Sequence, residues 1–333
     1  MPKVTVAMPV YNDGAYLREA IDSILVQTFK DFELLIVDDG STDDSAAIIA
    51  SYKDKRIRVL QHKKNYGRPY ARNTALNAAE SKYFAWMDSD DIALPQRLQA
   101  QIDFMETHTS VSICGAWVQC FGELNAVWKP PSKSEEITAY TVFGAAICNP
   151  TACFRLEDIN RQCIRYDRTL KRAQDFAFWG DLLLGAHLTA VNIPQILLHY
   201  RFFQRPTSSK WHTEALLSHI FPHLELATNT QMACLHTDLI YQSTQVLVEN
   251  YSLKKILGWL NTVWQACDKL PEGIRKFCRI MLRNHAERVL AVVPSLGNSW
   301  NLWQQTEPGA YWSRSLTLAR ILLRKAQNVI HSR

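Results

Sequence analysis

Hydrophobic and polar positions along the first 120 residues fall into short blocks of two kinds. Five short apolar runs predict strands, at residues 4–9, 32–37, 57–60, 83–87 and 111–116. Between these runs the apolar residues recur at helical spacing, most clearly at residues 15–27, 69–79 and 95–105. Strands and helices that alternate at this spacing predict crossover units, and therefore an α/β fold with a mostly parallel sheet flanked by helices.

The pattern changes twice in the rest of the chain. Residues 120–200 are less regular, and we expect loops and edge strands there. From about Trp211 onward the pattern is almost wholly helical. We therefore predict an α/β domain at residues 1–205 and a helical C-terminal region at residues 206–333.

Composition and hydropathy indicate the cellular compartment of the protein. No segment approaches the roughly 18 apolar residues that a membrane-spanning helix needs. The N-terminus has the pattern of a strand and not that of a signal peptide. The eight cysteines form no C-x-x-C pair and have no zinc-site spacing, which favours reduced thiols. We expect a cytoplasmic protein.

Charge is distributed unevenly along the chain. Residues 1–200 carry 21 basic and 24 acidic side chains, whereas residues 201–333 carry 16 and 8, so the net charge of +5 belongs to the C-terminal part. This excess favours an anionic partner, such as a membrane surface or a phosphorylated substrate, and we expect no nucleic-acid partner.

The last helical segment is both amphipathic and basic. Apolar residues recur at i+3/i+4 spacing from Trp312 to Ile330, mostly opposite Arg314, Arg324 and Lys325. Such a helix can lie on an anionic bilayer, which would place the protein peripherally on the inner face of the plasma membrane. Alternatively, its apolar face packs on the catalytic domain and its basic face is solvated. The pattern is compatible with both interpretations.

Polar and acidic residues follow three of the predicted strands. Tyr11-Asn12-Asp13 comes after the first strand, Asp38-Asp39-Gly40-Ser41 after the second, and Asp88-Ser89-Asp90-Asp91 after the fourth. Ligands of open α/β sheets bind beyond the carboxyl ends of the strands. We therefore expect the three loops to converge on one crevice.

The third of these loops has the ligand chemistry of a hard cation. In an extended segment Asp88 and Asp90 point the same way, with Asp91 nearby. Mg²⁺ and Mn²⁺ prefer oxygen ligands, and Mg²⁺ binds substrate phosphates beside one or two carboxylates. The loop therefore fits Mn²⁺ or Mg²⁺ that bridges the protein to a diphosphate. The alternative is a solvated turn before the helix that Pro95 can open.

The second loop can recognise a base. Asp38 and Asp39 follow a buried strand and precede the turn, and a carboxylate there can accept the N3–H of a uracil-type base. The alternative is a turn that leads into a helix N-terminus. The chain contains neither G-x-G-x-x-G after the first strand nor G-x-x-x-x-G-K-[ST]. A metal ion would therefore have to offset the negative charge of the phosphates.

Two long motifs in this order carry a resemblance to a known family. They are VAMPVYNDGAYLREAIDSILVQTFKDFELLIVDDGSTDDS and NYGRPYARNTALNAAESKYFAWMDSDDIALPQRL. The chain resembles the family 2 glycosyltransferases of the GT-A fold, strongly over residues 3–107 and more weakly to about residue 205. The resemblance implies a Rossmann-like GT-A domain, a nucleotide-sugar donor, a divalent metal, and inversion at the anomeric carbon.

The resemblance also implies roles for individual residues of the donor site. Pro9 and Tyr11 would line the base pocket, and Asp39, with Asp38 beside it, would read the base and ribose. Asp90 would bind the metal, with Asp88 close to the ribose and diphosphate. The other donor-site matches are Asn65, Gly67, Arg72, Asn73 and Asp91.

On the acceptor side, the family has an acidic pair before a helix, and its Asp acts as the general base. Asp175 stands at that Asp position, while Gln174 replaces the preceding Glu. The alternative role for Asp175 is a helix N-cap. Asn149 and Thr151 match an acceptor-side strand, and Arg201 belongs to a late Y-R segment that can meet phosphate.

The sequence thus predicts an inverting glycosyltransferase. It would transfer a sugar from a nucleotide sugar, first of all a UDP-sugar, to a hydroxyl of a glycan or lipid-linked acceptor in surface polysaccharide or glycolipid synthesis. The Q-x-x-R-W motif of processive synthases is absent. The alternatives are a sugar nucleotidyltransferase and a non-catalytic glycan- or membrane-binding protein.

Overall fold

The computed structural model describes residues 1–203, 209–293, 303 and 321. These residues belong to two compact units. The first unit comprises Met1–Thr138 and Ala145–Thr207, and the second comprises Ala139–Gly144 and Ser208–Arg333. The amphipathic segment from Trp312 to Ile330 lies outside the described residues, apart from Ile321, and its two interpretations stay predictions.

The first unit is built on one nine-stranded sheet with the order β3-β2-β1-β4-β8-β6-β9-β5, and β7 pairs with β6. The first four strands are parallel to one another: β1 (Val4–Val10), β2 (Phe32–Asp38), β3 (Ile57–Gln61) and β4 (Tyr83–Trp86). Because they are parallel, their carboxyl ends share one edge of the sheet. The strands predicted from the sequence are present there.

The other half of the sheet is mixed. It consists of β5 (Ile92–Ala93), β6 (Ile113–Gly122), β7 (Ala126–Trp128), β8 (Cys153–Arg155) and β9 (Ala190–Phe202). Strands β6 and β9 are parallel, whereas β8 is antiparallel to both β4 and β6. The predicted strand at residues 111–116 is in fact shifted and longer, because β6 continues to Gly122 beside β9.

Two apolar cores cover the two faces of the sheet. Alternate residues of β1 divide between them, since Val6 and Met8 belong to one core and Ala7 to the other. Helix α1 packs in the first core through Leu17, and α3 packs in the second through Ala75. Burial on both faces is typical of a parallel sheet and explains the nearly continuous apolar runs of β1 and β2.

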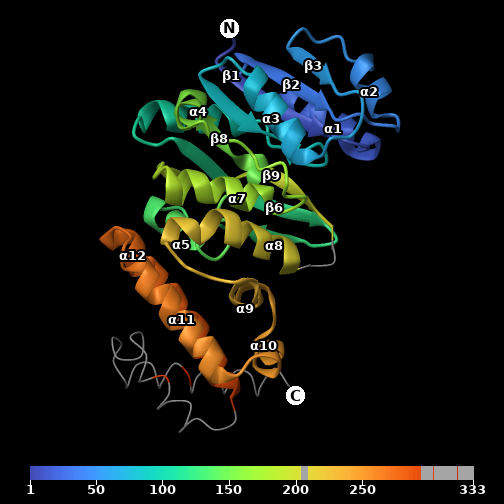
Figure 1. Cartoon of the computed structure of the whole chain (residues 1–333). Coiled ribbons are helices and arrows are strands. Elements are labelled where there is room, and N and C mark those ends of the chain that lie inside the picture. Colours follow the sequence, from blue (N-terminus) through green and yellow to red (C-terminus); the bar gives the residue numbers. More distant parts are fainter. Residues whose placement is uncertain (204–208, 294–302, 304–320, 322–333) are drawn as a thin grey trace. The chain divides into compact units, whose positions relative to one another are not determined.

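Figure 1 shows α1 and α3 lying along the β1–β3 part of the sheet. The helices of this part of the chain are α1 (Gly14–Leu25), α2 (Ser45–Ser51), α3 (Arg68–Ala78), α4 (Arg97–Thr107), α5 (Ser134–Thr141), α6 (Leu156–Gln162) and α7 (Gln174–Gly180). A short 3-10 helix, η1 (Asn149–Thr151), precedes β8, and a π-helical turn, η2 (Asp181–Gly185), follows α7. This is the predicted α/β fold class.

The second unit is helical where it is described. Its α-helices are α8 (Ser209–Ala215), α9 (Thr230–Tyr241), α10 (Thr244–Asn250), α11 (Leu253–Cys267) and α12 (Glu272–Val292). Two short turns, η3 (Leu216–Ile220) and η4 (Pro222–Leu224), follow α8. Among the residues described, no helix combines the length and the apolar character that crossing a bilayer requires.

A buried histidine occupies the core of the second unit. His236 accepts a hydrogen bond at Nδ1 from Trp259 Nε1 (3.2 Å), and its Nε2 lies 2.9 Å from the carbonyl oxygen of Val142. The Trp259 N–H can only donate, so the ring proton of the neutral imidazole must lie on Nε2. Burial lowers the pKa of His236 to about 4, since a charged imidazolium is poorly solvated there.

A fall in pH is therefore expected to destabilise this unit. In the unfolded state the histidine titrates near its ordinary pKa of 6.5, whereas in the folded state it stays neutral down to a pKa of about 4. Between these two pH values the unfolded state therefore binds one proton more than the folded state. The free energy of opening α9 should fall by about 2 kcal/mol between about pH 7 and about pH 5. Hydrogen exchange of the α9 amides measures it. His236→Gln should flatten this dependence, whereas His223→Gln, at an exposed position, should not. An unchanged slope in His236→Gln would contradict the assignment.

Candidate active site

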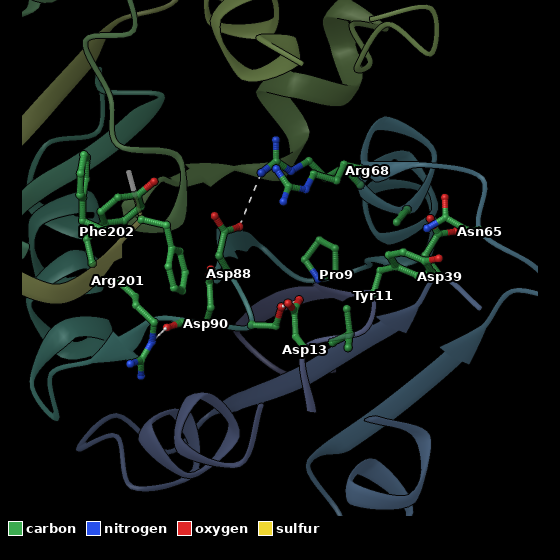
Figure 2. Close-up of a pocket in the computed structure, with 16 residues that line it drawn as sticks. Pro9, Tyr11, Asp13, Asp39, Asn65, Arg68, Asp88, Asp90, Arg201 and Phe202 are labelled. Carbon is green, nitrogen blue, oxygen red and sulfur yellow. Dashed lines mark hydrogen bonds and ion pairs between the residues drawn. The ribbon is translucent and has the colours of Figure 1, made fainter. Parts of the chain in front are cut away.

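The loops that follow β1, β2 and β4 meet at one pocket at the carboxyl edge of the sheet, as predicted from their phase with the strands. The pocket has a volume of about 240 Å³. In Figure 2, Tyr11, Asp39 and Asn65 lie toward one end of it, and Asp88, Asp90 and Arg201 toward the other. The residues that line it are Pro9, Val10, Tyr11, Asp13, Asp39, Asn65, Arg68, Ala71, Arg72, Asp88, Ser89, Asp90, Tyr200, Arg201, Phe202 and Phe203.

Most of the donor-site residues predicted from the sequence line this pocket. They are Pro9, Tyr11, Asp39, Asn65, Arg72, Asp88 and Asp90. Four residues predicted for the donor site are not part of the lining, namely Asp38, Gly67, Asn73 and Asp91, and neither is the predicted general base Asp175. Their contacts show what each of them does in the fold.

Three carboxylates crowd together at the end of β4. Oxygen atoms of Asp88, Asp90 and Asp91 all lie within 4.8 Å of one another. Burial, followed by the charges of Asp88 and Asp13, raises the pKa of Asp90 to about 6. Burial and the charges of Asp88 and Asp90 also raise the pKa of Asp91 well above its usual range. Ionised carboxylates are unfavourable here unless a cation offsets them.

The residues present fit a hard divalent cation. All three groups offer carboxylate oxygens, which are the ligands that Mg²⁺ and Mn²⁺ prefer. Asp91 accepts the backbone N–H of Arg201 at Oδ1 (2.7 Å), while its buried Oδ2 has no hydrogen-bond partner among the described residues. This oxygen and the half-exposed carboxylates of Asp88 and Asp90 could ligate an ion. The alternative of a simple solvated turn does not account for the burial of Asp91.

Arg72 supplies a buried positive charge beside this cluster. Its Nη2 lies 3.5 Å from Asp88 Oδ1, and its guanidinium lies over the rings of Trp86 (5.8 Å) and Tyr166 (5.3 Å). Burial opposes its charge, but the groups around it, Tyr166, Asp88 and Asp175, hold the pKa of Arg72 above its ordinary value. Within the described part of the chain, its Nε and Nη1 have no hydrogen-bond partner.

Asn73, next to Arg72, has a positioning role in the fold. Its side chain is buried and pairs with the backbone of Tyr166, donating to the carbonyl oxygen (2.8 Å) and accepting from the N–H (2.9 Å). The ring of Tyr166 then stacks on Phe178 of α7, with 4.1 Å between the ring centroids. Asn73 therefore fixes one wall of the Arg72 site and does not itself line the pocket.

The two aspartates that end β2 have different contacts. Asp38 turns away from the pocket and accepts hydrogen bonds from Ser41 N (2.9 Å) and Gln61 Nε2 (3.2 Å), so it holds the turn. Asp39 lines the pocket and accepts from Tyr66 N (3.1 Å) and Gly67 N (2.8 Å). Gly67 thus serves the site through its backbone.

Gly40 brings the Asn65 loop against the β2 turn. It has a φ of 72°, and a Cβ placed on it would lie 2.5 Å from the carbonyl carbon of Lys64 and 2.9 Å from Asn65 N. Only glycine adopts this conformation readily and also leaves room for the Lys64–Asn65 backbone. Asn65 reaches the pocket because of this close approach.

Asp175 lies near the pocket but does not line it. Helix α7 begins at Gln174, with Ala173 in the N-cap position, so the N-cap alternative for Asp175 is wrong. The half-buried carboxylate accepts a local hydrogen bond from Phe176 N (2.9 Å). Its charge contributes to the raised pKa of Arg72, so the Asp175 carboxylate lies within electrostatic reach of the Arg72 guanidinium.

Several lining residues were missed from the sequence. Asp13 accepts a hydrogen bond from the Ser89 hydroxyl and so ties the first acidic loop to the third. The sequence feature that could have identified Asp13 is its position directly after the first strand. Arg68, at the start of α3, has no motif that marks it. Phe202 and Phe203, next to the predicted Y-R segment at the end of β9, also line the pocket, from more than 100 residues away in the sequence.

Arg201 lines the pocket, so its expected contact with phosphate stays a prediction, and its side chain also acts as a clasp between two segments. Its guanidinium lies between the rings of Tyr16 (4.2 Å) and Phe121 (4.4 Å). Its Nε donates to the carbonyl oxygen of Asp90 (2.8 Å), and its Nη2 pairs with Glu19 (2.8 Å). Arg201 therefore fastens the end of β9 to the acidic loop.

Of the two expected acceptor-side residues, Thr151 has a hydroxyl group that already makes hydrogen bonds within the fold. Its hydroxyl donates to Cys148 O (2.8 Å) and accepts from Ala116 N (3.1 Å). Asn149 accepts from the Tyr166 hydroxyl (3.2 Å), and among the described residues its buried Nδ2 has no partner. Contact of either residue with an acceptor stays a prediction.

Comparison with known proteins identifies the family. The model of glycosyl transferase family 2 matches residues 5–163. An uncharacterized glycosyltransferase of Methanocaldococcus jannaschii is 36% identical over 212 residues, which cover 61% of this chain and 72% of that protein. The chain is a family 2 glycosyltransferase. Another uncharacterized glycosyltransferase, from Haemophilus influenzae, is 34% identical over 55% of this chain and 72% of its own length.

Solved structures share the fold of this glycosyltransferase. S. aureus TarS in complex with UDP superimposes with a TM-score of 0.59 at 20% identity, over 91% of this chain and 90% of that one. The mannosyltransferase PcManGT from Pyrobaculum calidifontis, in complex with GDP-Man and Mn²⁺, gives a TM-score of 0.52 at 15% identity, over 98% and 87%. At these identities the likeness shows the fold alone. The two solved structures share the GT-A architecture that was predicted for this chain.

Proposed function

We propose that this glycosyltransferase transfers a sugar, with inversion, from a nucleoside-diphosphate sugar to an acceptor hydroxyl. A UDP-sugar is the first candidate donor. The observation that carries the proposal is the single pocket in which the base-reading loop of Asp39 and the acidic loop of Asp88 and Asp90 meet. TarS, which shares the fold, is a UDP complex, and this supports a uridine donor.

The donor would lie along the pocket, from the base at Tyr11 to the diphosphate at Asp88. Pro9 and the half-exposed ring of Tyr11 offer an apolar surface for the base, and Asp39 offers a carboxylate acceptor for an imide N–H. Arg68 and Arg72 lie one helical turn apart on α3, so both reach the same side of the pocket. Their positive charges favour a diphosphate there.

Asp88, Asp90 and Asp91 would hold Mn²⁺ or Mg²⁺, with Asp90 the principal ligand. When bound, such an ion offsets the negative charge that develops on the leaving diphosphate. The carboxylates contribute by fixing the position of the ion, and the Arg201 clasp keeps their loop in place. The PcManGT structure contains Mn²⁺, which supports this choice of metal.

Asp175 would act as the general base. It takes the proton of the acceptor hydroxyl while that oxygen attacks the anomeric carbon, and the diphosphate leaves from the opposite face. The charges of both Asp88 and Asp175 act on Arg72, which supports a role for Arg72 next to the leaving group and the acceptor. Among the described residues, its buried Nε and Nη1 have no hydrogen-bond partner, and we propose that substrate oxygens supply one.

We further propose that residues 1–205 form the catalytic domain and that the basic C-terminal region serves the acceptor. A glycan or a lipid-linked acceptor of surface polysaccharide or glycolipid synthesis fits this arrangement. The excess of basic side chains in residues 201–333 supports contact with an anionic lipid surface at the inner face of the plasma membrane.

Titration calorimetry with UDP, in Mn²⁺ and in chelator, tests the donor site. We expect binding in Mn²⁺ that weakens by at least about tenfold when the metal is removed, because the diphosphate then faces the acidic loop directly. GDP and dTDP, measured in the same way, rank the nucleotides. Binding of equal strength with and without metal would contradict the proposed use of Asp88 and Asp90.

A further inference from the structure

His62 lies behind the donor pocket, at the end of β3, where it joins a pocket residue to helix α3. Its Nδ1 is 2.6 Å from Asp39 Oδ1, and its Nε2 is 3.0 Å from Thr74 Oγ1. The imidazole lies nearly perpendicular to the stacked rings of Tyr66 and Tyr70, with centroid distances of 5.6 Å to Tyr66 and 5.0 Å to Tyr70. The side chain of His62 is only 10% exposed, so it is a built part of this wall and not a surface group.

The two polar contacts determine how the imidazole is oriented. The Asp39 carboxylate can only accept, so Nδ1 of His62 carries the hydrogen and donates it. The Thr74 hydroxyl can serve Nε2 either as donor or as acceptor. A rotation of the ring would break both contacts and would push it into the neighbouring tyrosines. The Nδ1–H is therefore held in one direction, toward Asp39.

Within the described part of the chain, Asp39 is the only pocket residue that His62 contacts by a hydrogen bond or ion pair. Tyr66 N and Gly67 N approach the same carboxylate from the loop before α3. With His62 as a third donor, the plane of the carboxylate is fixed on two sides. The direction in which Asp39 can accept a further hydrogen bond from a ligand is then fixed as well.

We infer that His62 is a positioning residue for nucleotide selectivity, acting through Asp39. This inference rests on the proposed function, in which Asp39 accepts the imide N–H of a uracil-type base. A fixed carboxylate favours uracil, whose N3 carries a hydrogen. It disfavours cytosine, because the N3 lone pair of cytosine would face a carboxylate oxygen with no hydrogen between them. A carboxylate free to rotate would discriminate less, because it could turn away from the cytosine lone pair.

Three substitutions of His62 separate the Asp39 contact from the Thr74 contact. In His62→Asn the amide nitrogen can stand close to the position of Nδ1, so the donor to Asp39 is kept. In His62→Gln the longer side chain reaches toward the position of Nε2, so the contact with Thr74 is kept and the one with Asp39 is lost. His62→Phe fills the space beside the stacked rings of Tyr66 and Tyr70 without any hydrogen bond.

Titration calorimetry with UDP and CDP in Mn²⁺ measures the selectivity of the full chain. The wild-type protein should bind UDP more tightly than CDP. His62→Phe and His62→Gln should lower this preference by about tenfold, mainly through weaker UDP binding, while His62→Asn should stay within about threefold of wild type. In donor hydrolysis, the same loss should appear in KM with little change in kcat.

The outcomes separate this inference from the proposed function. Wild-type protein that binds neither nucleotide would overturn both. Wild-type preference for UDP that His62→Gln and His62→Phe retain in full would overturn this inference alone, as would His62→Asn with no more selectivity than His62→Gln. Equal wild-type affinity for UDP and CDP would also overturn it. Thermal melts check folding, and the Asn and Gln variants suffice for the test if His62→Phe does not fold.

Discussion

Asp175→Asn is expected to lower kcat by about 1,000-fold while donor binding stays at the wild-type level. Removal of a general base from its position typically costs 10²–10⁴-fold, and asparagine keeps the size of the side chain but cannot take up a proton. Asp175 does not line the donor pocket, so UDP affinity should not change. Transfer or donor hydrolysis gives kcat, and calorimetry with UDP gives the donor affinity of the same preparation.

Asp158→Asn is the matched control for this variant. Asp158 also lies in the first turn of a seven-residue helix, α6, so its substitution removes the same favourable charge from a helix N-terminus. It should leave kcat unchanged. If Asp175→Asn kept kcat within about tenfold of wild type, another group would have to accept the proton, and the proposed role of Asp175 would be wrong.

Asp90→Asn is expected to lower kcat/KM by about 100-fold or more and to remove most of the effect of Mn²⁺ on UDP affinity. A metal ion in such a site supplies several kcal/mol of charge stabilisation, and an amide oxygen is a weaker ligand than a carboxylate. Asp103→Asn, on the exposed side of α4, is the control for loss of an acidic side chain elsewhere. Metal-dependent transfer that survived in Asp90→Asn would contradict the assignment.

The same variant should be more stable than wild type when metal is absent. The pKa of Asp90 is raised to about 6, above its ordinary 3.8, so ionisation of this group in the folded state costs stability at neutral pH. Asparagine removes that cost, and the free energy of unfolding at about pH 7.5 in chelator should rise by about 3 kcal/mol. Addition of Mn²⁺ should raise the melting temperature of wild type more than that of Asp90→Asn. A lower stability of the variant in chelator would show that Asp90 has a structural role.

The parts of the site that the sequence predicted are those set by local order along the chain. Asp13, Asp39 and Asp88 each follow a strand of the parallel half of the sheet, so their convergence follows from strand direction alone. The resemblance added Asn65 and Arg72, and both line the pocket. All residues of this half of the site lie within the first 91 residues, where each loop directly follows its own strand.

The parts that could not be predicted depend on pairing between distant segments. Strand β9 brings Arg201 beside Asp91 through its pairing with β5 and β6, and no local pattern marks that register. The role of Asn73 depends on Tyr166, 93 residues away. Likewise, Asp38 and Asp39 are adjacent and chemically identical, and only the turn geometry decides which of them faces the pocket.

The close approach at Gly40 has a consequence for exchanging parts between related enzymes. The β2 turn and the Lys64–Asn65 backbone interlock with no room for even a methyl group, although they belong to separate segments of the chain. A chimera that imports one of these loops from a relative, to alter the choice of donor, would create a clash or a void unless it imports the other as well. For protein engineering, residues 38–41 and 62–67 therefore form a single transplantable cassette.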